Sequence, residues 1–256
     1  MRVSPINYSN INFKSINNLV KKERYVDYHE HPVLSNPNVN FFSNYTSFFR
    51  EDIASNWKKF IDIVDEHFED AKKVNVYCFG CSDGSESYSL AMGLFDRKGE
   101  KRTSKFFPIK AYDIDAEMIK KAKKGCIPCS ENDKVRINSN LSLSSWYCGI
   151  VDVPNDKEYP HRFLPKEKIK NMIDFQTGDF IAKLDEIEPC NTLLMCRNFW
   201  YYLGIDRIPE IVSKLAEKLD ETSLLVIGDF DRTYVLKELK NAGFEEITMN
   251  VLKKTK

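Results

Sequence analysis

The chain has 256 residues, of which 42% are hydrophobic and 30% are charged, a composition typical of folded proteins with one or two domains. The 38 Lys and Arg residues balance the 38 Asp and Glu residues, which argues against a nucleic-acid partner because such proteins usually carry an excess of basic residues. No run reaches the roughly 18 apolar residues of a membrane-spanning helix, and the N-terminus lacks the apolar core of a secretion signal.

The first half of the chain begins without clear periodicity. Residues 1–43 are rich in Asn, Ser and Tyr, and we expect them to form an irregular arm. Apolar residues then recur at three- and four-residue spacing from Ile53 to Phe68, which predicts an amphipathic helix. The apolar run 74–79 predicts a buried strand, and after a turn rich in Gly and Ser the residues 86–95 have a helical composition.

Strand and helix patterns continue to alternate towards the C-terminus, apart from an irregular stretch at 126–171. The further strands that we expect lie at 107–115, 192–196, 223–230 and 245–252. The further helices lie at 116–124, 206–220 and 232–244. This alternation predicts an α/β fold with a mostly parallel sheet and helices on both of its faces.

Polar residues follow each of the first four predicted strands, at the edge where such folds bind ligands. In chain order they are GCSDGSE, Asp113 with Asp115, Arg197 with Asn198, and GDFD. Gly80 and Gly84 let backbone approach a ligand closely, although this spacing also occurs in simple tight turns. Asp113 is placed to accept hydrogen bonds from the hydroxyls of a ribose, whereas Asp115 suits the N-cap of the next helix.

Four motifs, in this order, resemble the chemotaxis-receptor (CheR-type) methyltransferase family. They are Asn44-x-Thr46-x-Phe48-Phe49-Arg50, GCSDGSESYSLAM, AYDID and CRNFWYY. The resemblance covers about residues 44–230. It implies a Rossmann-like class I methyltransferase fold that uses S-adenosylmethionine, releases S-adenosylhomocysteine, and methylates glutamate side chains of a protein.

The resemblance also implies roles for single residues. Arg50 and Tyr202 would be catalytic, Glu86 would hold the methionine amino group of the cofactor, and Asp113 would hold its ribose. The full set implied to bind the cofactor is Asn44, Thr46, Arg50, Gly80, Ser82, Gly84, Glu86, Asp113, Asp179, Phe180, Arg197 and Asn198.

Three of these residues have a purely structural alternative. Arg50 could pair with an acidic residue on a helix face. Glu86 lies at a predicted helix N-terminus, where the helix dipole favours an acid in any case. Tyr202 belongs to an aromatic run, which more often serves packing.

The sequence also departs from the family pattern. Asp179 replaces an Asn near the adenine, where an aspartate can accept a hydrogen bond but cannot donate one. Ser85, Ser87 and the GDFD segment also differ from the residues that the family usually has. We therefore keep two functions open: an O-methyltransferase acting on protein carboxylates, and a non-catalytic sensor or interaction module that binds S-adenosylmethionine.

We expect one methyltransferase domain at 44–256, with a small inserted subdomain at 126–173. The 43 residues before it are too few for the helical receptor-binding domain that the resembled family usually carries.

The seven cysteines fit free thiols in a reducing compartment better than a disulfide framework, so we expect a cytoplasmic protein. Cys78 with Cys81 and Cys126 with Cys129 form two Cys-x-x-Cys pairs that would suit zinc. The gap between the pairs is much longer than the usual spacing of about 15–20 residues, so we expect no metal.

Overall fold

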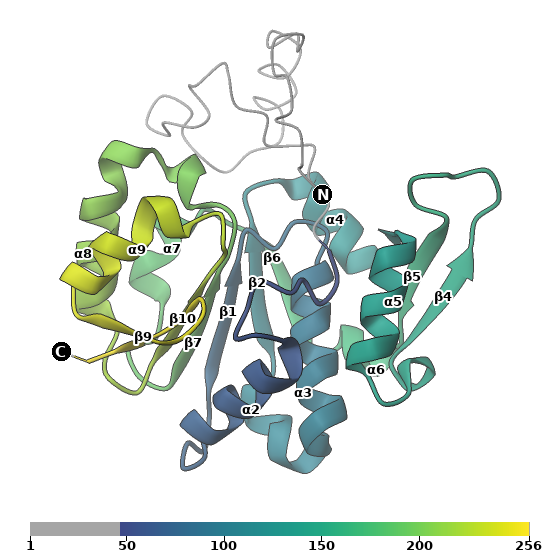
Figure 1. Cartoon of the computed structure of the whole chain (residues 1–256), viewed down its shortest axis with the longest axis horizontal. Coiled ribbons are helices and arrows are strands. Elements are labelled where there is room, and N and C mark those ends of the chain that lie inside the picture. The colour runs from purple at the N-terminus through teal and green to yellow at the C-terminus, as the bar shows by residue number, and fades with distance from the viewer. Residues whose placement is uncertain (1–46, 256) are drawn as a thin grey trace, which may run out of the picture.

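The computed structural model describes residues 47–255 (Figure 1). The predicted N-terminal arm and the predicted site residues Asn44 and Thr46 lie outside these residues. No helix within 47–255 combines the length and apolar character needed to cross a membrane.

Seven strands form the central sheet, in the order β6-β2-β1-β7-β8-β10-β9. Their bounds are β1 Asn75–Phe79, β2 Ile109–Asp113, β6 Ile173–Thr177, β7 Thr192–Cys196, β8 Leu224–Ile227, β9 Phe244–Thr248 and β10 Val251–Lys254. The five strands from β6 to β8 pair in parallel, and β10 pairs antiparallel with both β8 and β9. The predicted α/β fold with a mostly parallel sheet is confirmed.

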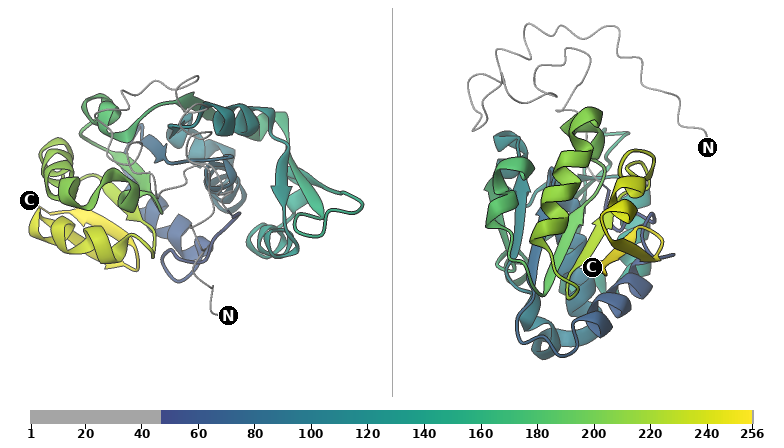
Figure 2. Two further views of the ribbon diagram at one scale, coloured as in Figure 1. Left: turned by 90° about the horizontal axis from the view of Figure 1, so that it is seen from above. Right: turned by 90° about the vertical axis from the view of Figure 1, so that its left-hand side faces the viewer.

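Helices cover both faces of this sheet (Figures 1 and 2). They are α2 Trp57–His67, α3 Ser85–Thr103 and α4 Ala116–Lys124 on one face, and α7 Phe180–Lys183, α8 Ile208–Lys218 and α9 Arg232–Asn241 on the other. Alternate residues of β1 pack into the two apolar cores, Val76 into the first and Tyr77 into the second. Burial on both faces explains why the parallel strands read as continuous apolar runs.

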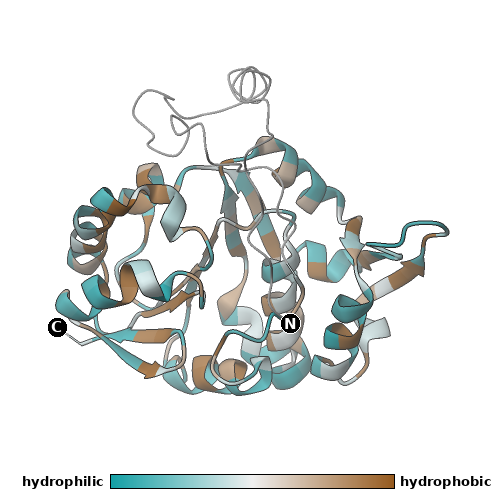
Figure 3. Cartoon of the chain, turned by 45° about the horizontal axis from the view of Figure 1, so that its top comes forward, coloured by the Kyte–Doolittle hydropathy of each residue, from teal (hydrophilic) through white to brown (hydrophobic). Residues whose placement is uncertain are grey.

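The helices carry both apolar and hydrophilic residues along their length (Figure 3). Local signals set their ends. The side chain of Asp115 accepts hydrogen bonds from the N–H groups of Glu117 and Met118, so Asp115 is the N-cap of α4 as predicted. Gly125 follows the same helix in the left-handed conformation at φ 65°, and the helix ends at Lys124, the limit that we predicted.

A second, three-stranded antiparallel sheet lies beside the central one (Figure 1). Its strands are β3 Ile127–Cys129, β4 Cys148–Asp152 and β5 His161–Pro165, in the order β3-β5-β4. Helices α5 Glu131–Asn140 and α6 Glu167–Lys170 accompany it. The prediction of an irregular stretch at 126–171 is therefore wrong, and the second sheet lies within the range 126–173 that we expected to be inserted.

Two strand predictions also need correction. Strand β6 was not predicted, because its residues alternate between buried and exposed positions and its apolar signal is weak. The single strand expected at 245–252 is two strands, β9 and β10, which form a hairpin. Asn250 reverses the chain between them with a φ of 65°, and no Gly or Pro signals this turn.

Candidate active site

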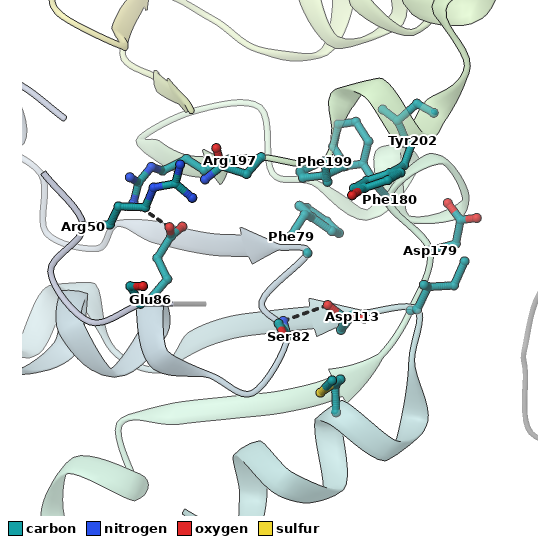
Figure 4. A pocket seen from close by; sticks show the side chains of 17 residues that line it. Arg50, Phe79, Ser82, Glu86, Asp113, Asp179, Phe180, Arg197, Phe199 and Tyr202 are labelled. Carbon is teal, nitrogen blue, oxygen red and sulfur yellow. Dashed lines mark hydrogen bonds and ion pairs between the residues drawn. The ribbon is translucent and has the colours of Figure 1, made fainter. Parts of the chain in front are cut away.

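A pocket of about 380 Å³ lies at the C-terminal ends of β1, β2, β6 and β7 (Figure 4). This volume falls in the usual range of roughly 300–1,000 Å³ for small-molecule sites. The predicted residues that line it are Arg50, Gly80, Ser82, Glu86, Asp113, Asp179, Phe180, Arg197, Asn198 and Tyr202. The pocket therefore brings together residues from four separate sequence motifs.

The turn after β1 holds the acidic residue at the end of β2. The N–H of Ser82 donates to Asp113 Oδ2 at 2.7 Å, and the N–H of Asp115 donates to Asp113 Oδ1 at 2.9 Å. A carboxylate has about four acceptor positions, and Asp113 lines the pocket.

Gly84 differs from the other predicted glycine of this turn, because it does not line the pocket. It precedes α3 in the left-handed conformation, with φ 89°. A Cβ at this position would lie 2.8 Å from the ring of Phe175. Gly84 therefore shapes the turn, whereas Gly80 lines the pocket itself.

A buried charge network occupies one end of the pocket. The Arg197 side chain is fully buried and donates to Glu86 Oε2 at 2.5 Å and to a carboxylate oxygen of Asp52. Arg50 Nε lies 3.5 Å from the other oxygen of Asp52, and 48% of the Arg50 side chain is exposed. Burial raises the pKa of Glu86, and the neighbouring Arg197 partly opposes that shift.

The segment that carries Arg50 is fixed by its two buried phenylalanines. The N–H of Phe49 donates to Ser89 Oγ of α3 at 2.9 Å, and the N–H of Phe48 donates to Asp133 Oδ1 of α5 at 3.1 Å. Both phenylalanine side chains are buried. Helix α5 therefore helps to hold Arg50 at the pocket. Arg50 does pair with an acidic residue, Asp52, but Asp52 precedes α2 and does not lie on a helix face.

Asp231 fixes the segment after β7. Its carboxylate accepts hydrogen bonds from the backbone N–H groups of Asn198 at 2.5 Å, Trp200 at 3.1 Å and Gly228 at 2.9 Å. Burial raises the pKa of Asp231 to about 6, although these three N–H donors oppose the shift. The ends of β7 and β8 are thus joined through one carboxylate.

Aromatic side chains form the walls between the two ends of the pocket (Figure 4). The ring centroids of Phe79 and Phe180 are 4.9 Å apart, and those of Phe180 and Phe199 are 5.3 Å apart. Arg50 lies at the end with Glu86 and Arg197, and Tyr202 lies at the opposite end. The two predicted catalytic residues therefore face the pocket from different sides.

Asp179, at the far end, has a structural role as well. Its side chain caps α7 by accepting from the N–H of Ile181 at 2.7 Å. It also lines the pocket beside Phe180.

Sequence reasoning missed several residues that line the pocket. They are Ser47, Phe79, Ile114, Met118, Gly178, Phe199 and Leu203. Most of them adjoin a predicted residue in the sequence, as Ile114 follows Asp113 and Phe199 follows Asn198. Asp52 was missed although it pairs with Arg197, because that contact joins residues 145 positions apart and leaves no local signal.

The two Cys-x-x-Cys pairs do not form a metal centre. All seven cysteines are free thiols. Within residues 47–255 no group of three or more His, Cys, Asp or Glu side chains is arranged to hold a metal ion.

The family model described as CheR methyltransferase, SAM binding domain, matches residues 44–248. A chemotaxis protein methyltransferase of Borreliella burgdorferi is 27% identical over 192 residues, which cover 73% of this chain and 63% of that protein. One of Listeria monocytogenes is 27% identical over 187 residues, covering 72% of this chain and 64% of that protein. The chain thus spans slightly less than two thirds of the length of these relatives.

Among solved structures, magnesium protoporphyrin IX methyltransferase from Synechocystis PCC 6803, with bound SAM, is 14% identical at a TM-score of 0.35. That comparison covers 96% of this chain and 97% of the other. A likeness this weak supports no argument about function, so the assignment depends on the family match. The chain belongs to the CheR methyltransferase family and contains its S-adenosylmethionine-binding domain.

Proposed function

We propose that this protein transfers a methyl group from S-adenosylmethionine to a carboxylate of a protein, as in glutamate methylation. The observation that carries the proposal is the composition of the pocket. It places a half-exposed guanidinium, Arg50, at a site whose described lining residues include no His, Lys or Cys. Such a site can orient an anionic nucleophile. We propose that its acidic residues Glu86, Asp113 and Asp179 bind the cofactor, so we assign none of them as a general base.

The residues of the pocket fit the cofactor. Glu86 offers a carboxylate for the ammonium group of the methionine end, and Asp113 offers acceptor positions for the ribose. Asn198 Oδ1 is buried and has no hydrogen-bond partner within residues 47–255, so it can accept from a bound polar group. Asp179 and Phe180 are the residues at the end where the adenine would bind.

The chain itself has to supply orientation and exclusion of water. When bound, S-adenosylmethionine supplies the methyl group, on a positively charged sulfur. A glutamate acceptor has a pKa of about 4.3 in water, so it is already ionised at neutral pH and needs no base. Arg50 would orient it through charge-assisted hydrogen bonds, and we propose it as a catalytic residue.

The aromatic walls would favour the reaction in a second way. An anion and a cation neutralise each other during this transfer, and a pocket of low polarity favours that loss of charge. Phe79, Phe199 and Tyr202 line the pocket and would exclude water from it. We propose that Tyr202 acts mainly in this way, because it lies across the pocket from Arg50 (Figure 4).

We also propose the domain limits and the compartment. The methyltransferase domain would span 44–256, with an inserted subdomain at 126–173. The free state of all seven cysteines supports a reaction in the cytoplasm.

One experiment separates this enzyme from a cofactor-binding module without turnover. Purified protein is first titrated with S-adenosylmethionine by calorimetry and then incubated with methyl-labelled cofactor and a cell extract. The proposal predicts binding and label on at least one protein. Binding without any labelled product would favour the module, and no binding would overturn both functions.

A further inference from the structure

Three aromatic side chains form a cluster beside the pocket, which we call the aromatic rim: Phe230, which is exposed, and Tyr201 and Tyr234, which are half-buried. Ring centroids are 5.3 Å apart for Tyr201 and Tyr234, 5.5 Å for Phe230 and Tyr234, and 6.3 Å for Tyr201 and Phe230. Tyr201 lies in the short helix Trp200–Leu203, Phe230 follows β8, and Tyr234 belongs to α9. Three segments of the chain thus bring these rings together.

The aromatic rim adjoins the pocket through Tyr201 and is linked to the Arg50 end through hydrogen bonds and an ion pair. The ring of Tyr201 lies 5.8 Å from that of Tyr202, which lines the pocket. On the other side, Phe230 follows Asp229, whose N–H donates to Asp52 Oδ2 at 3.3 Å. Asp52 in turn pairs with Arg50. The rim therefore adjoins the pocket at Tyr202, and the segment that carries Phe230 is hydrogen-bonded to Asp52, the partner of Arg50.

Phe230 is the exposed ring of this cluster. It is 52% exposed although it contacts two other rings. Single exposed apolar residues are common, but this ring packs on two half-buried aromatic side chains next to the pocket, so the three together offer an aromatic surface to a bound segment. Phe230 also belongs to the GDFD segment, in which this sequence departs from the family pattern.

We propose that the aromatic rim binds an apolar side chain of the protein acceptor, close in sequence to the carboxylate that is methylated. This inference rests on the proposed function. The half-exposed Arg50 suits the carboxylate of such a segment, and the uncharged rings suit its apolar side chain. The acceptor is thus a protein segment that carries both groups.

The ring-to-ring distances guide the choice of spacing between the glutamate and the apolar side chain. Phe230 lies two ring-to-ring steps, of 6.3 and 5.8 Å, from Tyr202, which lines the pocket. An extended chain advances about 3.3–3.6 Å per residue, so three or four residues span these two steps. We therefore test an apolar side chain at this spacing from the glutamate.

The test uses two synthetic peptides, each with a single glutamate. One carries Leu three residues before and three residues after the glutamate, and the other carries Ser at both positions. Binding is measured by fluorescence anisotropy on full-length protein loaded with S-adenosylhomocysteine, and methylation is measured separately. The variants are Phe230→Ser and Tyr234→Ser. The control is Ile247→Ser, which removes a 44% exposed side chain on β9. Unchanged S-adenosylhomocysteine affinity verifies that each variant is folded.

The Leu peptide should bind at least about tenfold more tightly than the Ser peptide. Either rim variant should abolish this difference, mainly through KM in the methylation assay, while Ile247→Ser should preserve it. Equal binding of both peptides, no binding of either, or an unchanged preference in Phe230→Ser would overturn the inference. So would self-association that Phe230→Ser abolishes, since the rim would then bind a second copy. A rim-dependent preference in binding without any methyl transfer would support the rim and overturn the proposed function instead.

Discussion

Arg50 is the residue on which the proposed chemistry depends most. Its half-exposed side chain lies at the pocket, next to a buried network that includes Asp52. Replacing it by alanine should lower kcat/KM about 10- to 100-fold, the range expected for losing hydrogen bonds to a charged group. Cofactor affinity should change much less. Kinetics with labelled cofactor and calorimetry separate the two effects.

The matched control is Arg97→Ala. Arg97 is another partly exposed arginine, 40% exposed, that pairs with Asp62 on the outside of the molecule. Its loss should leave kcat/KM unchanged. If Arg50→Ala transfers methyl at the full rate, Arg50 does not orient the acceptor.

Glu86 should make cofactor binding depend on pH. Burial raises its pKa, so it loses its charge at a higher pH than an ordinary glutamate does. The affinity for S-adenosylmethionine should therefore fall as the pH decreases through this raised pKa. Calorimetry between pH 5 and 8 measures the change.

Glu86→Gln should lower the affinity at neutral pH about 10- to 100-fold and weaken its pH dependence. Any pH dependence of the affinity that remains in this variant would come from Asp231, because burial raises the pKa of Asp231 to about 6. The control is Glu100→Gln, at an exposed glutamate of α3 that pairs with Lys168. A wild-type affinity that does not fall as the pH decreases towards the ordinary pKa of a glutamate would contradict the role of Glu86.

For single residues, local motifs made much of the pocket predictable. Residues at strand ends, such as Asp113 and Asn198, carry their signal in the few residues around them. Asp52 carries no such signal, because it acts through Arg197, far away in sequence. Asp231 lies in the GDFD segment at a predicted strand end, but its hydrogen bond to the Asn198 N–H is not evident from the sequence. Only the folded chain shows that these two carboxylates hold Arg197 and Asn198.

The ends of β7 and β8 form the most tightly packed contact between elements at the pocket. A Cβ added at Gly228 would overlap the Asn198 side chain and lie 2.9 Å from the Asn198 backbone nitrogen. Gly228→Ala should therefore displace Asn198, lower stability by about 1–3 kcal/mol and weaken cofactor binding. Thermal unfolding and calorimetry measure both effects.

Gly149→Ala, in β4, is the matched control. A Cβ there would have its nearest neighbour at 3.9 Å, so this change should alter neither stability nor affinity by much. Equal behaviour of the two variants would show that the Asn198 segment adapts freely.

Asp52 joins the Arg50 segment to the end of β7. Asp52→Asn would leave the fully buried Arg197 with one carboxylate partner fewer, and should lower the free energy of unfolding by about 3 kcal/mol. Asp62→Asn, at an exposed ion pair, should cost less than about 1 kcal/mol. Denaturant unfolding of both variants tests this, and similar losses would mean that the network adds no special stability.

The elements differed in how well they could be predicted. Helix α4 was fully specified by its own sequence, with Asp115 at one end and Gly125 at the other. Strand β6 and the β9–β10 hairpin were not. Strand β6 gains its stability from pairing with β2, and the turn at Asn250 depends on contacts with β8, where the Ile227 N–H donates to the Asn250 carbonyl. Tertiary contacts of this kind leave little trace in a short sequence window.

For the whole molecule, the alternation of strands and helices predicted the fold class and the edge at which the pocket lies. The alternation of sequence patterns did not reveal the second sheet, whose strands are short and are separated by helices and loops. The balance of 38 positive and 38 negative residues gives no net charge to attract an acceptor. We therefore propose that recognition depends on placed groups, such as Arg50 and the aromatic rim.

The central claim is that the acceptor is a carboxylate. Methyl esters hydrolyse in alkali, whereas methyl groups on nitrogen do not. Protein labelled by this chain from methyl-labelled S-adenosylmethionine is therefore treated with alkali, and volatile labelled methanol is collected, with the Arg50→Ala variant in parallel. We predict that wild-type protein gives labelled methanol and that the variant gives at least about tenfold less. Label that stays on the protein in alkali would contradict the claim.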